Sequence, residues 1–314
     1  MNNKTKDSII EALKKWLDEK GFKPADFSKR FEISSSYLSN LLQGKYSFQN
    51  GTEKDTVIDD KYFRAIAEAI DFNFENKLVW TARQTPQFMQ MISYLDDARN
   101  YGYTTIIIGE TGSGKTFSSD IFIKSNPKDL FKITVGSLDT VTDLLDKIAT
   151  AIRIPLEGTQ SKKLRIITDA LLKLHMDGRK PTMIWDESEF MKSSTLRNVK
   201  EMHDHLYGKC ALVLIGTSQL KHNIEKLKNK NIQGMPQFYR RVKYSIRELR
   251  PIDTEFKDFL TSIGDHKLKK FLQQECSNYG ELHDVLLPSM REAERLGEPL
   301  SENLVRKVLN LPRL

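Results

Sequence analysis

Apolar residues recur at helical spacing through the first 72 residues of the chain. In residues 3–19 they fall on one face of a helix, and similar faces follow after Pro24 and after Ser34 or Ser35. Breaks between these segments lie at Gly21, at Glu32–Ser34 and at Gly44. A further amphipathic helix is predicted at residues 60–72. The pattern predicts an all-α domain whose middle two helices have the spacing of a helix-turn-helix.

From residue 86 to about residue 218, short apolar runs alternate with longer amphipathic segments. The short runs predict buried strands, and they read TTIIIG, FKITVG, TMIWD and ALVLIG. The longer segments predict helices at residues 86–100, 139–152, 161–176 and 193–206. Such alternation is typical of parallel βαβ units, in which helices cover both faces of one sheet.

The last part of the chain, residues 253–309, contains no convincing strand pattern and predicts three or four helices. The predicted fold class is therefore α/β, with a parallel-sheet core between an N-terminal all-α domain and a small C-terminal helical domain. The predicted boundaries are 1–72 for the helix-turn-helix domain, 73–84 for a linker, 85–250 for the α/β domain and 251–314 for the helical domain.

The first predicted strand of the core runs directly into a phosphate-binding loop. The segment fits G-x-x-x-x-G-K-[ST] in full, with the residues Gly109, Glu110, Thr111, Gly112, Ser113, Gly114, Lys115 and Thr116. Glycines let the backbone turn its N–H groups toward phosphate oxygens, and the following helix adds its positive dipole end. Lys115 is expected to reach the β- and γ-phosphates, and the Thr116 hydroxyl to bind Mg²⁺. ATP and Mg²⁺ are the expected cofactors.

Two further strands end in polar residues that suit ATP hydrolysis. TMIWD ends at Asp186, followed by Glu187, and ALVLIG is followed by Thr217. Because the carboxyl ends of parallel strands face the ligand, all three are expected beside the phosphate loop. We expect Asp186 to hold Mg²⁺, Glu187 to orient and polarise the attacking water, and Thr217 to sense the γ-phosphate or the water.

Composition narrows the class of protein. The 314 residues suit about two domains, and 39% hydrophobic with 29% charged residues is ordinary for a globular protein. No run of about 18 apolar residues is present, so no transmembrane helix is expected. The first residues lack the apolar core of a signal peptide, and the two cysteines match no metal spacing. A cytoplasmic protein without membrane contact is predicted.

Charge is concentrated in one segment. The chain has a net charge of +7, and residues 221–250 alone hold nine basic and two acidic residues. Such a segment attracts phosphate, either of nucleic acid or of a nucleotide, although a solvated lysine-rich loop is the plainer interpretation.

With these motifs the chain resembles the AAA+ ATPases that serve DNA transposition, the Mu B-like family of phage target-DNA activators. The resemblance rests on the N-terminal helix-turn-helix, on GETGSGKT, MIWDESEFM and ALVLIGTSQL, and on the short helical C-terminal part. It implies ATP-dependent, sequence-non-specific binding of double-stranded DNA, assembly into a homo-oligomeric ring or helical filament, and delivery of the DNA to a DDE transposase that is activated. It also implies slow ATP hydrolysis that DNA or the transposase stimulates.

The resemblance also assigns residues. Lys115, Thr116, Asp186 and Glu187 match the family's ATP site, and Thr217 stands at its first sensor position. The segment FYRR resembles the place of an arginine finger that completes a neighbouring subunit's site; Arg240 is preferred to Arg241. His283 stands where the family pattern has a second-sensor arginine, so hydrolysis is expected to be weak unless Arg291 substitutes.

DNA contacts are less well defined by motif. In the N-terminal domain the second helix of the pair would present Ser35, Ser36, Ser39 and Asn40, with Lys45 just after it. In the ATPase domain the candidates are Lys162, Lys163 and Arg165, and a basic 221–230 loop with Lys226, Lys228 and Lys230. Residues 1–84 hold 14 basic and 13 acidic residues, so auxiliary DNA binding is expected there.

Two alternative functions share the same motifs. A helicase-loader or replication-initiator ATPase would prefer single strands or a specific origin. A transcriptional regulator would use the helix-turn-helix as its working part and the ATPase as a switch, but the nearly neutral N-terminal domain argues against it.

Overall fold

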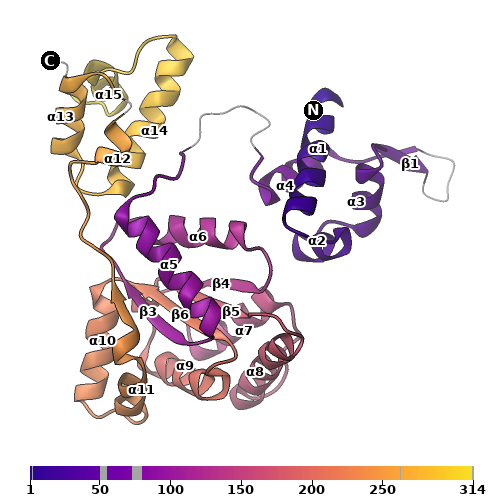
Figure 1. Cartoon of the computed structure of the whole chain (residues 1–314), viewed down its shortest axis with the longest axis vertical. Helices are drawn as coiled ribbons and strands as arrows, with labels where there is room; N and C mark the ends of the chain where they lie inside the picture. Colours follow the sequence, from indigo (N-terminus) through magenta and orange to yellow (C-terminus); the bar gives the residue numbers. More distant parts are fainter. Residues whose placement is uncertain (2, 50–54, 73–79, 262, 313–314) are drawn as a thin grey trace. The chain divides into compact units, whose positions relative to one another are not determined.

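The computed structural model describes residues 1, 3–49, 55–72, 80–261 and 263–312 (Figure 1). The chain divides into two compact units, Met1–Val79 and Trp80–Leu314. Of the predicted linker 73–84, residues 73–79 lie outside the described residues, and residues 80–84 have no regular secondary structure.

The first unit is a small helical fold around one apolar core. Its helices are α1 (Asn3–Glu19), α2 (Pro24–Arg30), α3 (Ser35–Leu42) and α4 (Asp60–Ala69). Side chains from all four helices meet in the core, among them Leu13, Phe27, Leu41 and Phe63, which are almost completely buried. The helical periodicity of the sequence therefore corresponds to one shared interior.

A short antiparallel hairpin stands between α3 and α4, and the sequence pattern does not reveal it. Its strands are β1 (Ser47–Gln49) and β2 (Asp55–Val57), with Ser47 paired to Val57. Strands of three residues are too short to show a period of two. Helix α4 ends at Ala69, earlier than the predicted residue 72, and Asp71 has a left-handed φ of 58°.

The second unit is built on a five-stranded sheet. Its strands are β3 (Thr104–Ile108), β4 (Leu130–Thr134), β5 (Thr182–Asp186), β6 (Ala211–Gly216) and β7 (Ile246–Glu248). They pair in the order β4-β5-β6-β3-β7, and every pairing is parallel. The carboxyl ends of all five strands therefore lie on the same side of the sheet.

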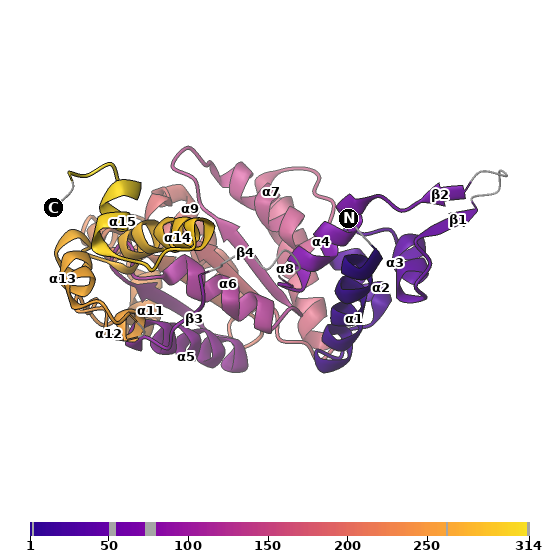
Figure 2. The same cartoon turned by 90° about the horizontal axis from the view of Figure 1, so that it is seen from above.

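Helices cover both faces of the sheet, as the alternating pattern predicts (Figures 1 and 2). One face packs against α5 (Pro86–Tyr101) and α6 (Lys115–Ser125). The other packs against α7 (Val141–Ile152), α8 (Gln160–Met176), α9 (Ser193–Leu206), α10 (Ser218–Asn229) and α11 (Met235–Val242). The predicted α/β class with a parallel-sheet core is confirmed.

Local signals explain where these helices begin and end. Thr85 caps α5 by accepting a hydrogen bond from the Phe88 amide, and Gly102 ends the helix with a left-handed φ of 65°. Thr140 and Asp143 form a capping box at the start of α7.

The basic segment 221–250 is mostly helical, so the expectation of a basic 221–230 loop was wrong. Leu220, Ile224 and Leu227 are spaced to one face of α10 and pack into the core beside the sheet. Lys226, Lys228 and Lys230 are exposed to solvent. The same segment then adds β7, an edge strand that the sequence did not reveal because it is three residues long and carries Arg247 and Glu248.

Residues 253–312, apart from 262, fold into four helices: α12 (Lys257–Leu260), α13 (His266–Glu275), α14 (Tyr279–Leu296) and α15 (Glu302–Val308). Their apolar core includes Phe256, Leu268, Leu282 and Val305. Trp80, which precedes α5, packs against the same core. The two ends of the second unit are thereby joined in one cluster.

Candidate nucleotide-binding site

The predicted phosphate loop connects β3 to α6. Gly112 and Gly114 have φ values of 75° and 81°, which residues other than glycine rarely adopt. Helix α6 begins at Lys115 without a side-chain cap, so its first amides remain for a ligand. The structure thus places residues 109–116 in one turn at the carboxyl end of β3.

Lys115 folds back over this loop. Its Nζ donates hydrogen bonds to the carbonyl oxygens of Gly109 at 2.9 Å and of Glu110 at 2.7 Å. Burial lowers the pKa of Lys115, while nearby carboxylates oppose this shift, Glu189 most strongly and Asp186 next. The ammonium is therefore held among acids at the γ-phosphate end of the loop.

Asp186 ends β5 and is almost completely buried, with 2% exposed. Its Oδ2 lies 3.1 Å from Lys132 Nζ, and the same ammonium lies 2.6 Å from Asp120 Oδ1. The backbone amide of Glu187 donates to Asp186 Oδ1 at 3.0 Å. The buried charge is thus compensated, and the carboxylate is fixed in one orientation.

The residues predicted to hold Mg²⁺ fit that ion chemically. Thr116 offers a hydroxyl and Asp186 a carboxylate, and Mg²⁺ prefers such oxygen ligands. In the described part of the chain no group of three or more His, Cys, Asp or Glu residues could hold a metal by itself. Two protein oxygen ligands are what Mg²⁺ usually has in such sites, because it takes its remaining ligands from phosphates and water.

Glu187 and Thr217 follow the ends of β5 and β6. Glu187 is exposed and has a left-handed φ of 55°. Thr217 is half-buried at the start of α10, and its side chain makes no capping hydrogen bond. Glu189, three residues after Asp186, is an acid that the sequence motif did not single out.

A cavity of ≈ 440 Å³ opens beside the phosphate loop. Residues 112–118 line one side, and an aromatic group, Trp80, Phe259, Tyr279 and His283, lines the other. The rings of Trp80 and Phe259 stack with centroids 5.1 Å apart and planes at 17°, and His283 meets Trp80 edge-on at 5.2 Å. The cavity therefore joins a phosphate-binding end to a flat aromatic end.

Sequence reasoning missed most of this aromatic wall. Trp80 and Phe259 lie far apart in the chain and belong to no motif, so their meeting depends on tertiary packing. A weak signal was available, because Trp80 is a large apolar residue in a segment that otherwise looks like a connector.

The helical C-terminal part touches the phosphate loop directly. The Gly280 amide donates a hydrogen bond to the Gly112 carbonyl oxygen at 3.2 Å. Asn278 caps α14 by accepting from the Glu281 amide at 2.9 Å. A Cβ on Gly112 would lie 2.1 Å from Asn278 Oδ1, so only glycine fits there.

His283, at the predicted second-sensor position, does line the cavity. Its Nδ1 lies 2.8 Å from Asp284 Oδ1, and its ring contacts Trp80. Arg291, two turns further along α14, is not among the residues that line the cavity. The structure therefore brings His283 to the site as an aromatic neighbour, without Arg291.

Arg240 and Arg241 lie at the C-terminal end of α11, which leads through residues 243–245 to the amino end of β7. The phosphate loop follows the carboxyl end of β3, which is parallel to β7. These arginines therefore lie near the amino ends of the strands, on the side of the sheet opposite the site in their own chain. Arg241 forms an ion pair with Asp204. Arg240 is exposed, and within the described residues no ion pair engages it.

The predicted DNA-contacting residues fall into separate places. On α3 of the first unit, Ser35, Ser36 and Ser39 are exposed, and Asn40 donates to the Ser36 carbonyl oxygen. Lys45 follows that helix and is exposed. In the second unit, Lys162, Lys163 and Arg165 stand on α8, and Lys226, Lys228 and Lys230 on or just after α10. Because α8 packs against α7 and α9 while α10 packs against α11, these are two distinct basic groups.

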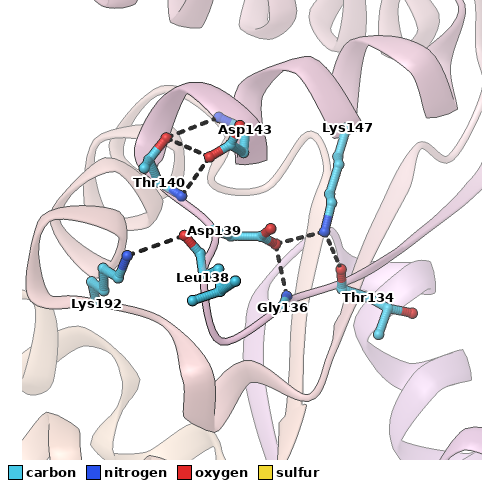
Figure 3. A network of polar contacts seen from close by, with 8 residues as sticks. All are labelled: Thr134, Gly136, Leu138, Asp139, Thr140, Asp143, Lys147 and Lys192. Carbon is cyan, nitrogen blue, oxygen red and sulfur yellow. Dashed lines mark hydrogen bonds and ion pairs between the residues drawn. The ribbon is translucent and has the colours of Figure 1, made fainter.

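The loop between β4 and α7 lies beside Asp186 at the carboxyl ends of the strands, since the Val135 amide donates to the Asp186 carbonyl oxygen. Figure 3 shows the Asp139 carboxylate between the Gly136 amide, at 2.7 Å, and Lys147 Nζ, at 2.6 Å. Partial burial acts to raise the pKa of Asp139, but these two hydrogen bonds bring it below its usual value. The loop thereby holds Leu138 out, 87% exposed.

Comparisons with known proteins agree with this geometry. Residues 98–224 match the model of a family described as AAA domain. Cdc6p from Pyrobaculum aerophilum is similar in structure, with a TM-score of 0.55 and 16% identity over 78% of this chain and 70% of that chain. The ORC2 protein of Aeropyrum pernix, in ADPNP–ADP complexes, gives a TM-score of 0.53 and 15% identity over 77% and 70%.

At these identities the likeness shows the fold alone. No curated protein sequence matches significantly. Along the described stretches of the chain, no helix combines the length and apolar character needed to cross a membrane. Residues 98–224 thus resemble an AAA domain, whereas the resemblance to Mu B-like transposition activators stays a prediction.

Proposed function

We propose that this protein is an oligomeric AAA+ ATPase that binds ATP with Mg²⁺ and couples its hydrolysis to binding DNA. The observation that carries the proposal is the continuity of the site. A glycine-rich turn at the start of α6 opens into a cavity that ends in stacked aromatic rings. An anionic phosphate chain fits the first end, and a purine base fits the second.

Each predicted residue has a role in this proposal. Lys115 binds the β- and γ-phosphates once they replace its two carbonyl contacts, and Thr116 and Asp186 hold Mg²⁺. The ion supplies charge neutralisation on the phosphates. Glu187 polarises water from the solvent side, and Thr217 contacts the γ-phosphate from the end of β6.

Arg240 acts on a second copy of the chain. It lies near the amino ends of the strands, whereas its own phosphate loop lies at their carboxyl ends, and it is exposed. Head-to-tail packing of copies would bring it to a neighbour's nucleotide, which gives a ring or an open helical filament. The ion pair of Arg241 with Asp204 supports the choice of Arg240 as the finger.

The structural comparisons favour the initiator type of DNA-dependent ATPase, because the similar structures are Cdc6 and ORC proteins. We therefore place the helicase-loader or replication-initiator function first. The second candidate is the transposition activator that delivers DNA to a transposase, and the motif resemblance supports it.

The test is ATP hydrolysis and electron microscopy on random duplex DNA, single-stranded DNA and no DNA, with Lys115→Ala as the control. Hydrolysis by the wild type and its loss in Lys115→Ala is the expected result, and absence of both binding and hydrolysis would overturn the proposal. ATP-dependent filaments on any duplex would favour the transposition activator. Discrete complexes, or a preference for single strands, would favour the initiator or loader.

A further inference from the structure

The turn after β5 sends its two glutamates in different directions. Glu187 takes a left-handed φ of 55°, and a single 3₁₀ turn, Ser188–Phe190, follows. Ser188 is completely buried, and its hydroxyl donates to the Trp185 carbonyl oxygen at 2.9 Å. Glu187 therefore remains in solvent, whereas Glu189 turns back toward the end of the sheet.

The Glu189 side chain reaches the end of β6. A Cβ added to Gly216 would lie 2.7 Å from Glu189 Oε2, so glycine makes room for the carboxylate. The Asn223 side chain, from α10, donates to the Glu189 carbonyl oxygen at 3.2 Å and fixes its backbone. Oε2 is buried, and no hydrogen-bond partner for it is found among the residues that the structure describes.

This carboxylate belongs to the γ-phosphate end of the site. The Gly109 amide, which starts the phosphate loop, donates to the Gly216 carbonyl oxygen at 3.0 Å. A Cβ on Gly109 would meet Lys115 Cδ at 3.2 Å. Of the carboxylates around Lys115, Glu189 acts most strongly to raise its pKa. Glu189 thus lies close to Gly216, Gly216 is hydrogen-bonded to Gly109, and Gly109 lies close to Lys115.

A buried carboxylate oxygen without a donor costs free energy, so the fold is expected to supply it with a partner in the working state. The γ-phosphate cannot be that partner, because it is anionic and has no donor. Lys115 is drawn to the phosphates when a nucleotide is bound. A water molecule at the γ-phosphate, by contrast, has protons to donate.

We propose that Glu189 is a second catalytic carboxylate, which accepts a hydrogen bond from the attacking water on the β6 side while Glu187 approaches from solvent. This proposal rests on the proposed ATPase function. The water oxygen forms a bond to the γ-phosphorus as the bond to the bridging oxygen of ADP breaks. The bridging oxygen keeps that electron pair, and the water proton passes to Glu189 and then to solvent.

The test compares Glu189→Gln with Glu187→Gln, using Glu201→Gln on the exposed side of α9 as the matched control for loss of charge. We expect Glu189→Gln to lower kcat by about 10²-fold or more while ATP and ADP affinities stay within about threefold of wild type. The fall of kcat on the acid side of the wild-type pH profile is expected to flatten. Glu189→Asp should retain part of the activity.

Two outcomes would overturn the assignment. One is a Glu189→Gln variant with kcat within about threefold of wild type. A second is a parallel loss of kcat, nucleotide affinity and melting temperature in both Glu189→Gln and Glu189→Asp, which would mean a structural role. The proposed ATPase function fails separately, if the wild type does not hydrolyse ATP, whether or not it binds the nucleotide.

Discussion

Individual side chains around the site are held in place by their neighbours, and these contacts suggest the role of each. Asp186 is buried and paired with Lys132, so its carboxylate is held in one orientation before a nucleotide binds. Trp80 stands at the other end of the cavity, stacked on Phe259. The phosphate end is thus set by charge and the base end by flat aromatic surface, and the two can be tested independently.

Replacing Trp80 by alanine is expected to weaken nucleotide binding without removing it. Loss of base–aromatic stacking is worth about 1–3 kcal/mol, or about 5- to 150-fold in Kd. Titration of wild-type and Trp80→Ala protein with ATP and ADP measures the effect, and Trp80→Phe is the matched control that keeps a ring. An equal loss in both variants would contradict a stacking role.

His203 makes the stability of the second unit depend on pH. Burial lowers its pKa from 6.5 to about 4, with the charges of Arg241 and Lys200 adding to the effect, and its Nδ1 lies 2.7 Å from Thr104 Oγ1. Between pH 6.5 and about 4 the unfolded chain binds a proton that the folded chain does not. The free energy of unfolding should therefore fall as the pH drops through this window.

Urea unfolding at several pH values from 7 to 4 measures this dependence, and His203→Gln is the comparison. The variant should be less stable at pH 7, because it loses the fitted ring. Its stability should also change less between pH 6.5 and 4. A pH dependence equal to that of wild type would assign the effect to other groups.

Secondary-structure elements show which parts of the site the sequence could predict. The phosphate loop and Asp186 were found because the loop follows, and Asp186 ends, a five-residue strand that is fully buried. The strand β7 and the hairpin β1–β2 were missed because strands of three residues show no period. The turn holding Glu189 was missed for a related reason, since one 3₁₀ turn has no sequence signature.

The loop and helix after β4 form the element with the best-defined cap. The Thr140 hydroxyl accepts a hydrogen bond from the Asp143 amide at 3.3 Å, and the Asp143 carboxylate accepts from the Thr140 amide at 2.8 Å. We expect Thr140→Ala to lower the free energy of unfolding by about 0.5–2 kcal/mol, and Thr140→Ser to lower it less. Chemical denaturation of the three proteins tests this. Equal stabilities would mean that the loop is held by Asp139 and Lys147 alone.

At the scale of the whole molecule, the aromatic wall depends on the joining of the two ends of the second unit. Trp80 comes from before α5, and Phe259, Tyr279 and His283 come from the C-terminal helices. No local sequence pattern predicts this contact, which is why the motifs predicted the phosphate loop but not the aromatic wall. The proposed arginine finger, Arg240, would make the site depend on a second copy of the chain as well.

Mixing two inactive variants tests that dependence on a neighbour. Lys115→Ala lacks the phosphate-binding lysine but keeps Arg240, and Arg240→Ala has the reverse defect. We expect each alone to hydrolyse ATP at less than about a tenth of the wild-type rate, because an arginine finger contributes 10³–10⁵-fold in other ATPases and GTPases. Their mixture should regain activity. Arg241→Ala is the comparison. It should lower the free energy of unfolding, because the ion pair with Asp204 is lost, while its kcat should fall less than that of Arg240→Ala.

The fit between Gly112 and Asn278 bears on how long a nucleotide stays bound. The helical part contacts the phosphate loop through a backbone hydrogen bond and leaves no space for even a methyl group. We therefore expect the helices to move away from the loop only when this bond breaks, so that uncovering the cavity and freeing the loop are a single kinetic event. The dwell time of the product would then be set at the first turn of α14, by residues that never touch a phosphate.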